Sequence, residues 1–334
     1  MRKSIYFVAP KLVEVHESEI PHPGSGQVLV ETIVSAISPG TEMLVYRGQF
    51  PNMPVDSNIE ALSGKFSYPM AYGYACVGRI TEVGKGAAED WLGRTVFSFQ
   101  PHTSHFLATP SALLSLPPGV APENACFFPN AETAVNLIQD AAPLIGERVL
   151  VLGQGIVGLM TTALLEKFPL ECLVCADLLS IRREASKELN VSAVFDPSDP
   201  DFEVNIRKII KSGVDLSFEL TGSPLALNTA ISFTTFSGRI VIGSWYGEKR
   251  ALIDLGGSFH RSRIKMISSQ VSTISPELTG RWDKARRYGT TWQAIQMIDP
   301  KKWITHRFSI DEASQAYRLL DTSPQETVQV VLGY

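Results

Sequence analysis

The sequence predicts an α/β protein in which a doubly wound parallel sheet follows a β-rich N-terminal part. From Arg148 onward, continuous apolar runs alternate with helical segments through short links, which is typical of a parallel sheet covered on both faces. Before residue 125, short alternating runs separated by Gly and Pro indicate strands of another kind of sheet. The 334 residues exceed what one core usually holds, so we expect two domains.

The N-terminal third is predicted to consist of short strands. The expected strands are KSIYFV, KLVEVHES, QVLVETIVSAIS, ACVGRITEVG, RTVFSF and SHFLAT. The segment LPPGVAPENACFF then marks a turn and the start of a helix, because Pro122 precedes an apolar-periodic segment that ends near Leu137.

Strands and helices alternate regularly after residue 148. The expected strands are RVLVLG, CLVCAD, AVFDP, VDLSFELTG, RIVIGSWY and KMISSQVS, and the expected helices are IVGLMTTALLEKF, SIRREASKEL, FEVNIRKIIKSG and SPLALNTAISFTTF. Right-handed crossovers would wind such a sheet in both directions. We therefore divide the chain at residues 1–125, 126–272 and 273–334, and we expect the last segment to return to the first domain.

The composition argues against several classes of protein. A net charge of -4 does not favour a nucleic-acid or anionic membrane surface. No apolar run approaches the roughly 20 residues of a membrane helix. The N-terminus does not resemble a secretory signal. Four cysteines are too few for a disulfide framework. We expect a cytoplasmic protein whose partner is a small-molecule substrate.

A glycine-rich loop predicts the cofactor site. Gly153, Gly155 and Gly158 have G-x-G-x-x-G spacing, directly after a strand of buried type and at the start of a helix. The first glycine permits the tight turn, the second lets a pyrophosphate approach the backbone, and the third lets the helix pack on the strand. Asp177 ends the next strand, about 20 residues on, where a carboxylate accepts hydrogen bonds from the adenosine ribose. This pattern predicts dinucleotide binding.

Asp177 also favours NAD(H) over NADP(H). An ionised carboxylate ~4 Å from a 2′-phosphate would cost roughly 4 kcal/mol at an effective dielectric near 20. Arg182 and Arg183 follow, and they either reduce this penalty or face water on the helix. The residues expected to bind cofactor within this region are Gly153, Gln154, Gly155, Ile156, Val157, Gly158, Asp177, Arg182 and Thr221.

The C-x-x-C of Cys172 and Cys175 is interpreted as core packing. Three residues apart on a predicted strand, the two side chains point to opposite faces of the sheet, so they neither share an ion nor form a disulfide.

Several motifs together identify a family resemblance. With PGTEMLVYRG, GYACVGRITEVG, ETAVNLI and RVLVLGQGIVGL in this order, the chain resembles the medium-chain dehydrogenase/reductase superfamily over essentially its whole length. The resemblance implies a GroES-like catalytic domain, a Rossmann domain and a substrate cleft between them. It also implies a homodimer formed through the edge of the Rossmann sheet, and a contact of Thr133 with the nicotinamide.

The zinc ligands of this superfamily are missing from the matching positions. Members that use zinc read G-H-E-x-x-G, whereas here Gly73 is followed by Tyr74. The place of the first cysteine ligand holds Pro39, and the third falls at Pro129 or Asn130. The cysteine-rich lobe of the structural zinc is also missing. Because zinc needs three or four N, S or O ligands in tetrahedral reach, we expect a member that lacks both zinc sites.

Four residues are candidates for proton handling without a metal, which would depend on hydrogen bonding and general acid–base chemistry. Thr41 matches the superfamily's proton-relaying hydroxyl, or else caps a turn. Glu42 is a base or an ion-pair partner. Tyr74, in the place of the missing histidine, either donates a proton to the substrate oxygen or fills the metal cavity. His102 either reaches the cleft from the end of a strand or is a surface histidine. Its H-x-x-H with His105 lacks a third ligand.

These observations predict a zinc-independent, NAD(H)-dependent oxidoreductase that transfers hydride between nicotinamide and a secondary alcohol or ketone in the interdomain cleft. One alternative is an NADPH-dependent quinone or enoyl reductase, but Asp177 counts against it. Another is a noncatalytic protein that binds a dinucleotide.

Overall fold

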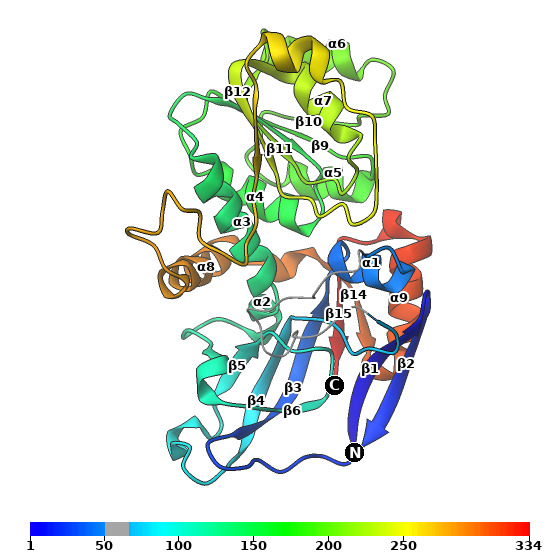
Figure 1. Ribbon diagram of the computed structural model, residues 1–334, viewed down its shortest axis with the longest axis vertical. Coiled ribbons are helices and arrows are strands. Elements are labelled where there is room, and N and C mark those ends of the chain that lie inside the picture. Colours follow the sequence, from blue (N-terminus) through cyan, green and yellow to red (C-terminus); the bar gives the residue numbers. More distant parts are fainter. Residues whose placement is uncertain (51–66) are drawn as a thin grey trace. The chain divides into compact units, whose positions relative to one another are not determined.

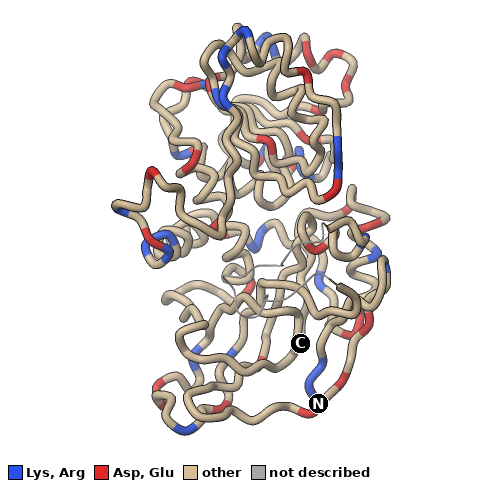
Figure 2. Tube along the Cα trace, in the orientation of Figure 1, with Lys and Arg blue, Asp and Glu red and all other residues tan. Residues whose placement is uncertain are grey.

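The chain forms two units in the computed structural model, which describes residues 1–50 and 67–334 (Figure 1). Unit 1 comprises Met1–Pro129 and Asp299–Tyr334, and unit 2 comprises Asn130–Ile298. Within the described ranges, no helix has the length and apolar character needed to cross a bilayer. Acidic and basic residues are interspersed along the trace of both units rather than collected in one basic stripe (Figure 2).

Unit 1 is built around a seven-stranded sheet whose central strand is β3. Strand β3 pairs antiparallel with β15, β4 and β6, so it joins the N-terminal strands to the end of the chain. A separate antiparallel hairpin consists of β1 and β2. The strands are β1 (Arg2–Ala9), β2 (Leu12–Ser18), β3 (Val28–Ile37), β4 (Cys76–Val83), β5 (Thr95–Ser98), β6 (His105–Ala108), β7 (Leu114–Ser115), β14 (Ile304–Ser309) and β15 (Gln329–Gly333).

Among its described residues, unit 1 has the α-helices α1 (Thr41–Arg47), α2 (Pro122–Ala125) and α9 (Ala313–Thr322). Helix α9 packs its apolar face against α1 and β2, with Tyr317 fully buried at the centre. The Tyr317 ring meets Phe7 edge-on at 5.1 Å and stacks on Tyr46 at 5.6 Å, both between ring centroids. This aromatic group belongs to the core between the hairpin and the two helices.

Unit 2 contains the predicted doubly wound sheet. Its six parallel strands lie in the order β10-β9-β8-β11-β12-β13. The strands are β8 (Arg148–Leu152), β9 (Cys172–Ala176), β10 (Ala193–Phe195), β11 (Val214–Glu219), β12 (Thr234–Ile242) and β13 (Lys265–Ser268). The longer helices are α3 (Phe128–Ala141), α4 (Ile156–Leu165), α5 (Ser180–Lys187), α6 (Phe202–Ile210), α7 (Ala226–Phe233) and α8 (Lys284–Ile298).

Separate apolar clusters cover the two faces of this sheet, as a doubly wound sheet requires. On β9, Cys172 packs against the cluster that contains Val174, whereas Cys175 belongs to the cluster on the opposite face. The predicted packing role of these two cysteines is therefore confirmed.

The boundary of the last segment differs from the expected residue 273, because residues 273–298 belong to unit 2. Arg287 of α8 is fully buried and donates to Glu132 of α3 at 2.7 and 3.0 Å. Its remaining donors reach Asn136 at 2.5 Å and the carbonyl of Thr273 at 2.9 Å. A buried ion pair with these additional hydrogen bonds holds α8 on α3, so the return to unit 1 begins at Asp299.

Replacing Arg287 with alanine is expected to lower the free energy of unfolding by about 3 kcal/mol, since the buried Glu132 would lose two of its hydrogen bonds and keep only the half-exposed Lys284 as a cation partner. Urea unfolding followed by circular dichroism measures the change. The matched control is Arg286→Ala, which removes an exposed arginine from the same turn and should cost less than ~0.5 kcal/mol. Equal effects of the two substitutions would contradict the assignment.

Candidate functional site

The glycine loop of unit 2 has the backbone geometry that only glycine permits. Gly153 has φ +91°, and a Cβ there would lie 2.6 Å from the carbonyl carbon of Leu220. A Cβ on Gly158 would lie 2.0 Å from the oxygen of Gly153. Helix α4 starts directly after Gly155, so its first N–H groups and the positive end of its dipole face the loop. Together these features form an anion site suited to a pyrophosphate.

Asp177 lies beside this loop with only 7% of its surface exposed. One carboxylate oxygen accepts a hydrogen bond from the backbone N–H of Gln154 at 2.7 Å, and the other accepts from that of Leu179 at 2.8 Å. An ionised carboxylate has about four acceptor positions, so it retains capacity for ribose hydroxyls. Arg182 places Nη1 3.9 Å from Asp177, and burial lowers the pKa of this arginine. The Arg182 guanidinium also lies next to Gly155.

Some of the residues expected to bind cofactor support the loop instead of lining it. The Gln154 side chain is fully buried and accepts hydrogen bonds from Thr162 at 3.1 Å and Ser186 at 3.0 Å. Ile156 is buried in the core, Val157 packs against the apolar cluster that contains Cys175, and Thr133 is half-buried on α3. Only the backbone of Gln154 and its neighbours is therefore available to a phosphate.

A second polar group lies inside unit 1 around the fully buried carboxylate of Glu42. One oxygen accepts hydrogen bonds from Nε2 of His102 at 2.9 Å and from the hydroxyl of Tyr317 at 2.6 Å. The other accepts from the backbone N–H of Ser38 at 2.9 Å. His102, Tyr317 and the backbone of Ser38 thus converge on this carboxylate.

His102 is enclosed, so the expectation that it reaches an open strand end is wrong. It is 0% exposed, and its second ring nitrogen is 2.7 Å from Oγ of Ser35. That hydroxyl is in turn 2.7 Å from the hydroxyl of Tyr334. Gly73 has φ +125°, and a Cβ there would lie 2.6 Å from the imidazole. The histidine ring thus packs against a backbone that must be glycine, and its hydrogen bond fixes its orientation relative to Glu42.

Sequence reasoning missed Ser35, Tyr317 and Tyr334 as members of this group. They come from β3, from α9 and from the last position of the sequence, with no motif linking them. Only the sheet pairing of β3 with β15 brings Ser35 and Tyr334 together.

Tyr74 and Thr41 complete the arrangement next to Glu42. The side chains of Ser38 and Thr41 act on the Tyr74 phenol so as to lower its pKa. Burial, and after it the charge of Glu42, raises the pKa of Tyr74 to about 12. The phenol is consequently protonated at neutral pH. Unit 1 therefore brings together all four residues proposed for proton handling, with Thr41 at the start of α1.

The residues around Tyr74 do not fit a zinc ion. The side chains of Glu42 and His102 are hydrogen-bonded to each other. The buried thiol of Cys76 donates a hydrogen bond to the carbonyl of Gln100 at 3.3 Å. Residues 1–50 and 67–334 contain no group of three or more His, Cys, Asp or Glu side chains able to hold a metal. His105 is 3.0 Å from the Ser104 hydroxyl and does not join His102 in one site.

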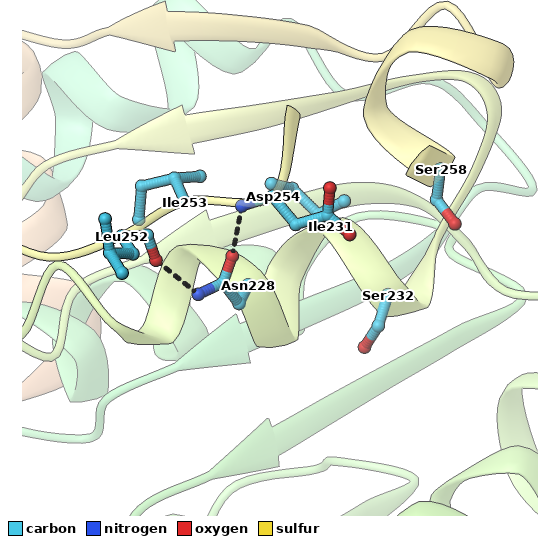
Figure 3. Close-up of a pocket in the computed structure, with 7 residues that line it drawn as sticks. All are labelled: Asn228, Ile231, Ser232, Leu252, Ile253, Asp254 and Ser258. Carbon is cyan, nitrogen blue, oxygen red and sulfur yellow. Dashed lines mark hydrogen bonds between the residues drawn. The ribbon is translucent and has the colours of Figure 1, made fainter. Parts of the chain in front are cut away.

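A cavity of about 360 Å³ opens elsewhere in unit 2, between α7 and residues 252–258 (Figure 3). Asn228 donates to the carbonyl of Leu252 at 2.9 Å and accepts from the N–H of Asp254 at 2.9 Å. None of its lining residues was expected to bind cofactor.

The two sheets and the glycine loop together define the fold of the medium-chain dehydrogenases, with a GroES-like unit and a Rossmann unit. The family model of zinc-binding dehydrogenases matches residues 157–287. In sequence, the chain is 23% identical to L-threonine 3-dehydrogenase of Pyrococcus horikoshii, over 92% of this chain and 91% of that protein.

Two solved structures show how far the fold is shared. One is a short chain alcohol dehydrogenase (rspB) from Escherichia coli CFT073 complexed with NADH, with a TM-score of 0.79, 20% identity, and coverage of 100% of this chain and 99% of that one. The other, described as a zinc-binding dehydrogenase from Sinorhizobium meliloti 1021, is bound to NADP, with a TM-score of 0.78, 17% identity, and coverage of 100% and 99%.

Replacing Glu42 with glutamine is expected to lower the pKa of Tyr74, because the negative charge that disfavours tyrosinate is removed. Ultraviolet difference titration of the phenols, with Tyr74→Phe subtracted to identify the transition, measures the change. Glu14→Gln removes an exposed carboxylate of the same unit and serves as control. A Tyr74 transition that stays in place in Glu42→Gln would show that the carboxylate has no influence there.

Proposed function

We propose that the protein is a zinc-independent, NAD(H)-dependent oxidoreductase that transfers hydride between nicotinamide and a secondary alcohol or its ketone. The glycine loop carries this proposal. At Gly153 and Gly158 there is no room for a Cβ atom, so the backbone can approach a ligand closely. Helix α4 begins directly after the loop, and the buried carboxylate of Asp177 follows β9. Small-molecule oxidation and reduction need little more from this unit than binding and orientation of the dinucleotide.

The preference for NAD(H) rests on Asp177. Its two oxygens are fixed by backbone N–H groups, so the carboxylate cannot swing away from an incoming 2′-phosphate. Arg182 is already close to Asp177 and is itself largely buried, which limits its use as a phosphate ligand. One structural relative holds NADH and another holds NADP, so the preference is argued from this chain alone.

Unit 1 supplies the proton. When bound, the reduced nicotinamide provides the hydride that forms the new C–H bond at the carbonyl carbon. Tyr74 donates its phenolic proton to the carbonyl oxygen as negative charge develops there, and hydroxyls of Ser38 and Thr41 stabilise the resulting tyrosinate. Glu42 and His102 position this group and do not touch the substrate. No step of this proposal passes through a metal.

The homodimer remains part of the proposal. Strand β13 is the outer strand of the parallel sheet in unit 2, and one of its edges is unpaired within the described chain. Such an edge is open to pairing with a second copy.

Fluorescence titration with NADH and NADPH, before and after exhaustive chelation, tests the cofactor assignment. We expect NADH to bind more tightly than NADPH, with no effect of the chelator. Asp177→Ala should reduce the NADH preference by at least about tenfold, because a penalty of roughly 1.4 kcal/mol or more disappears. The control is Asp201→Ala, which removes an exposed carboxylate of the same unit. Failure of either dinucleotide to bind would exclude the proposed function, and preference for NADPH would favour a quinone or enoyl reductase.

Tyr74→Phe tests the proton donor. Loss of the phenol should lower kcat by about 10²–10⁴-fold, the usual contribution of general acid catalysis, and leave the Kd of NADH unchanged. A screen of secondary alcohols and ketones provides the substrate for this measurement. Tyr6→Phe, on β1 where the ring stacks on His16, is the matched control. Undiminished turnover in Tyr74→Phe would assign the tyrosine to packing.

A further inference from the structure

Unit 2 contains a buried carboxylate that the proposed function does not use. Glu219, the last residue of β11, is 0% exposed. One oxygen accepts from the backbone N–H of Thr221 at 2.8 Å and from its hydroxyl, and the other accepts from the hydroxyl of Tyr246 at 2.5 Å. All three donors are uncharged. They suit an ionised acceptor, and no ion pair joins Glu219 to a Lys, Arg or His among residues 1–50 and 67–334.

Tyr246 is held in the donor role. Burial, the hydrogen bond to Glu219 and the charge of Glu219 all raise the pKa of this phenol far above its usual value. The proton therefore stays on the tyrosine oxygen, and this oxygen donates to Glu219.

The loops that follow β11 and β12 are joined at several points around this carboxylate. The N–H of Gly222 donates to the Ser244 hydroxyl at 2.9 Å, and Nζ of Lys249 donates to the carbonyl of Gly222 at 2.8 Å. The N–H of Gly243 donates to the carbonyl of Glu219 at 3.1 Å. These bonds fix the position of the charge relative to the glycine loop, since Gly153 lies against Leu220 and Thr221.

The order of the strands places Glu219 on the nicotinamide side of the site. The sheet reverses its winding between β8 and β11, and a dinucleotide binds across the carboxyl ends of the strands at such a point. Asp177 marks the adenosine half, because it ends β9 on one side of β8. The nicotinamide half accordingly lies toward the ends of β11 and β12, where Glu219 and Tyr246 are found.

We propose that Glu219 makes the site bind the oxidised cofactor in preference to the reduced one. This inference rests on the proposed function. The oxidised nicotinamide ring carries a positive charge and the reduced ring carries none, so a fixed negative charge nearby stabilises the oxidised form selectively. Glu219 is thereby a specificity-determining residue that favours binding of the cofactor form required for alcohol oxidation.

Equilibrium titrations with NAD⁺ and NADH test the inference in the full-length chain. In Glu219→Gln we expect the Kd of NAD⁺ to rise about tenfold, as for one unit charge at ~10 Å in an effective dielectric near 20, with the Kd of NADH nearly unchanged. This change in the ratio of the two Kd values corresponds to about 30 mV in the potential of the bound two-electron couple.

Two further variants distinguish the effect of the Glu219 charge from the effect of its hydrogen bonds on the loops after β11 and β12. Tyr246→Phe removes a donor and keeps the charge, so the ratio of the two Kd values should stay within about twofold of the unmodified protein. Glu219→Asp keeps the charge and should retain most of the ratio even if both affinities fall. The ratio is the useful quantity, because damage to the loops weakens NAD⁺ and NADH alike.

The outcomes distinguish this inference from the function on which it rests. Equal weakening of NAD⁺ and NADH in Glu219→Gln would overturn the charge effect while leaving the dinucleotide site intact. A changed ratio in Tyr246→Phe matching that of Glu219→Gln would also overturn it, since it would assign the effect to loop structure. Failure of the unmodified protein to bind either form would exclude the proposed function and this inference together.

Discussion

Carboxylates taken out of water must find donors within the fold, and this requirement organises both units. Glu42 joins α1, α9 and the segment that carries His102 in unit 1. Glu132 draws the arginine of α8 into the core of unit 2, and Glu219 joins the loops that follow β11 and β12. Each carboxylate obtains at least one donor from a segment distant in the sequence. Because an unsatisfied buried charge is costly, these segments are held in place as firmly as by apolar packing.

The parts of the structure that could be predicted from the sequence depend on local patterns. The glycine loop at residues 153–158 can be recognised from its spacing alone, and the opposite orientation of Cys172 and Cys175 follows from their separation along β9. The structure also contains the predicted parallel sheet. The expectations that failed concern polar residues of types that usually lie at the surface. His102 follows a predicted strand, a position that suggests an accessible side chain, yet it is buried. Arg287 stands among other basic residues, a pattern typical of a surface, yet it is buried as well. Their partners, Ser35 and Glu132, are separated from them by 67 and 155 positions.

The likeness to zinc-binding dehydrogenases is strongest in the fold and weakest at the metal positions. Tyr74 occupies the position that the superfamily resemblance assigns to a histidine ligand, and the neighbouring Glu42 and His102 are hydrogen-bonded to each other. Gly73 leaves room for the imidazole of His102, which lies next to Glu42. This arrangement accounts for how the unit can keep the shared architecture while its residues provide no metal donor set in the described ranges.

Each unit contains a buried cysteine whose reaction with a thiol reagent would report local unfolding of that unit. Burial raises the pKa of Cys76 in unit 1 and of Cys175 in unit 2 to about 12 in both cases, so neither thiol forms appreciable thiolate while its unit is closed. A thiol reagent added to the native protein would therefore modify each of them at a rate set by local unfolding around it. Peptide mapping of the modified cysteines would then report which half of the molecule opens first when cofactor is withdrawn.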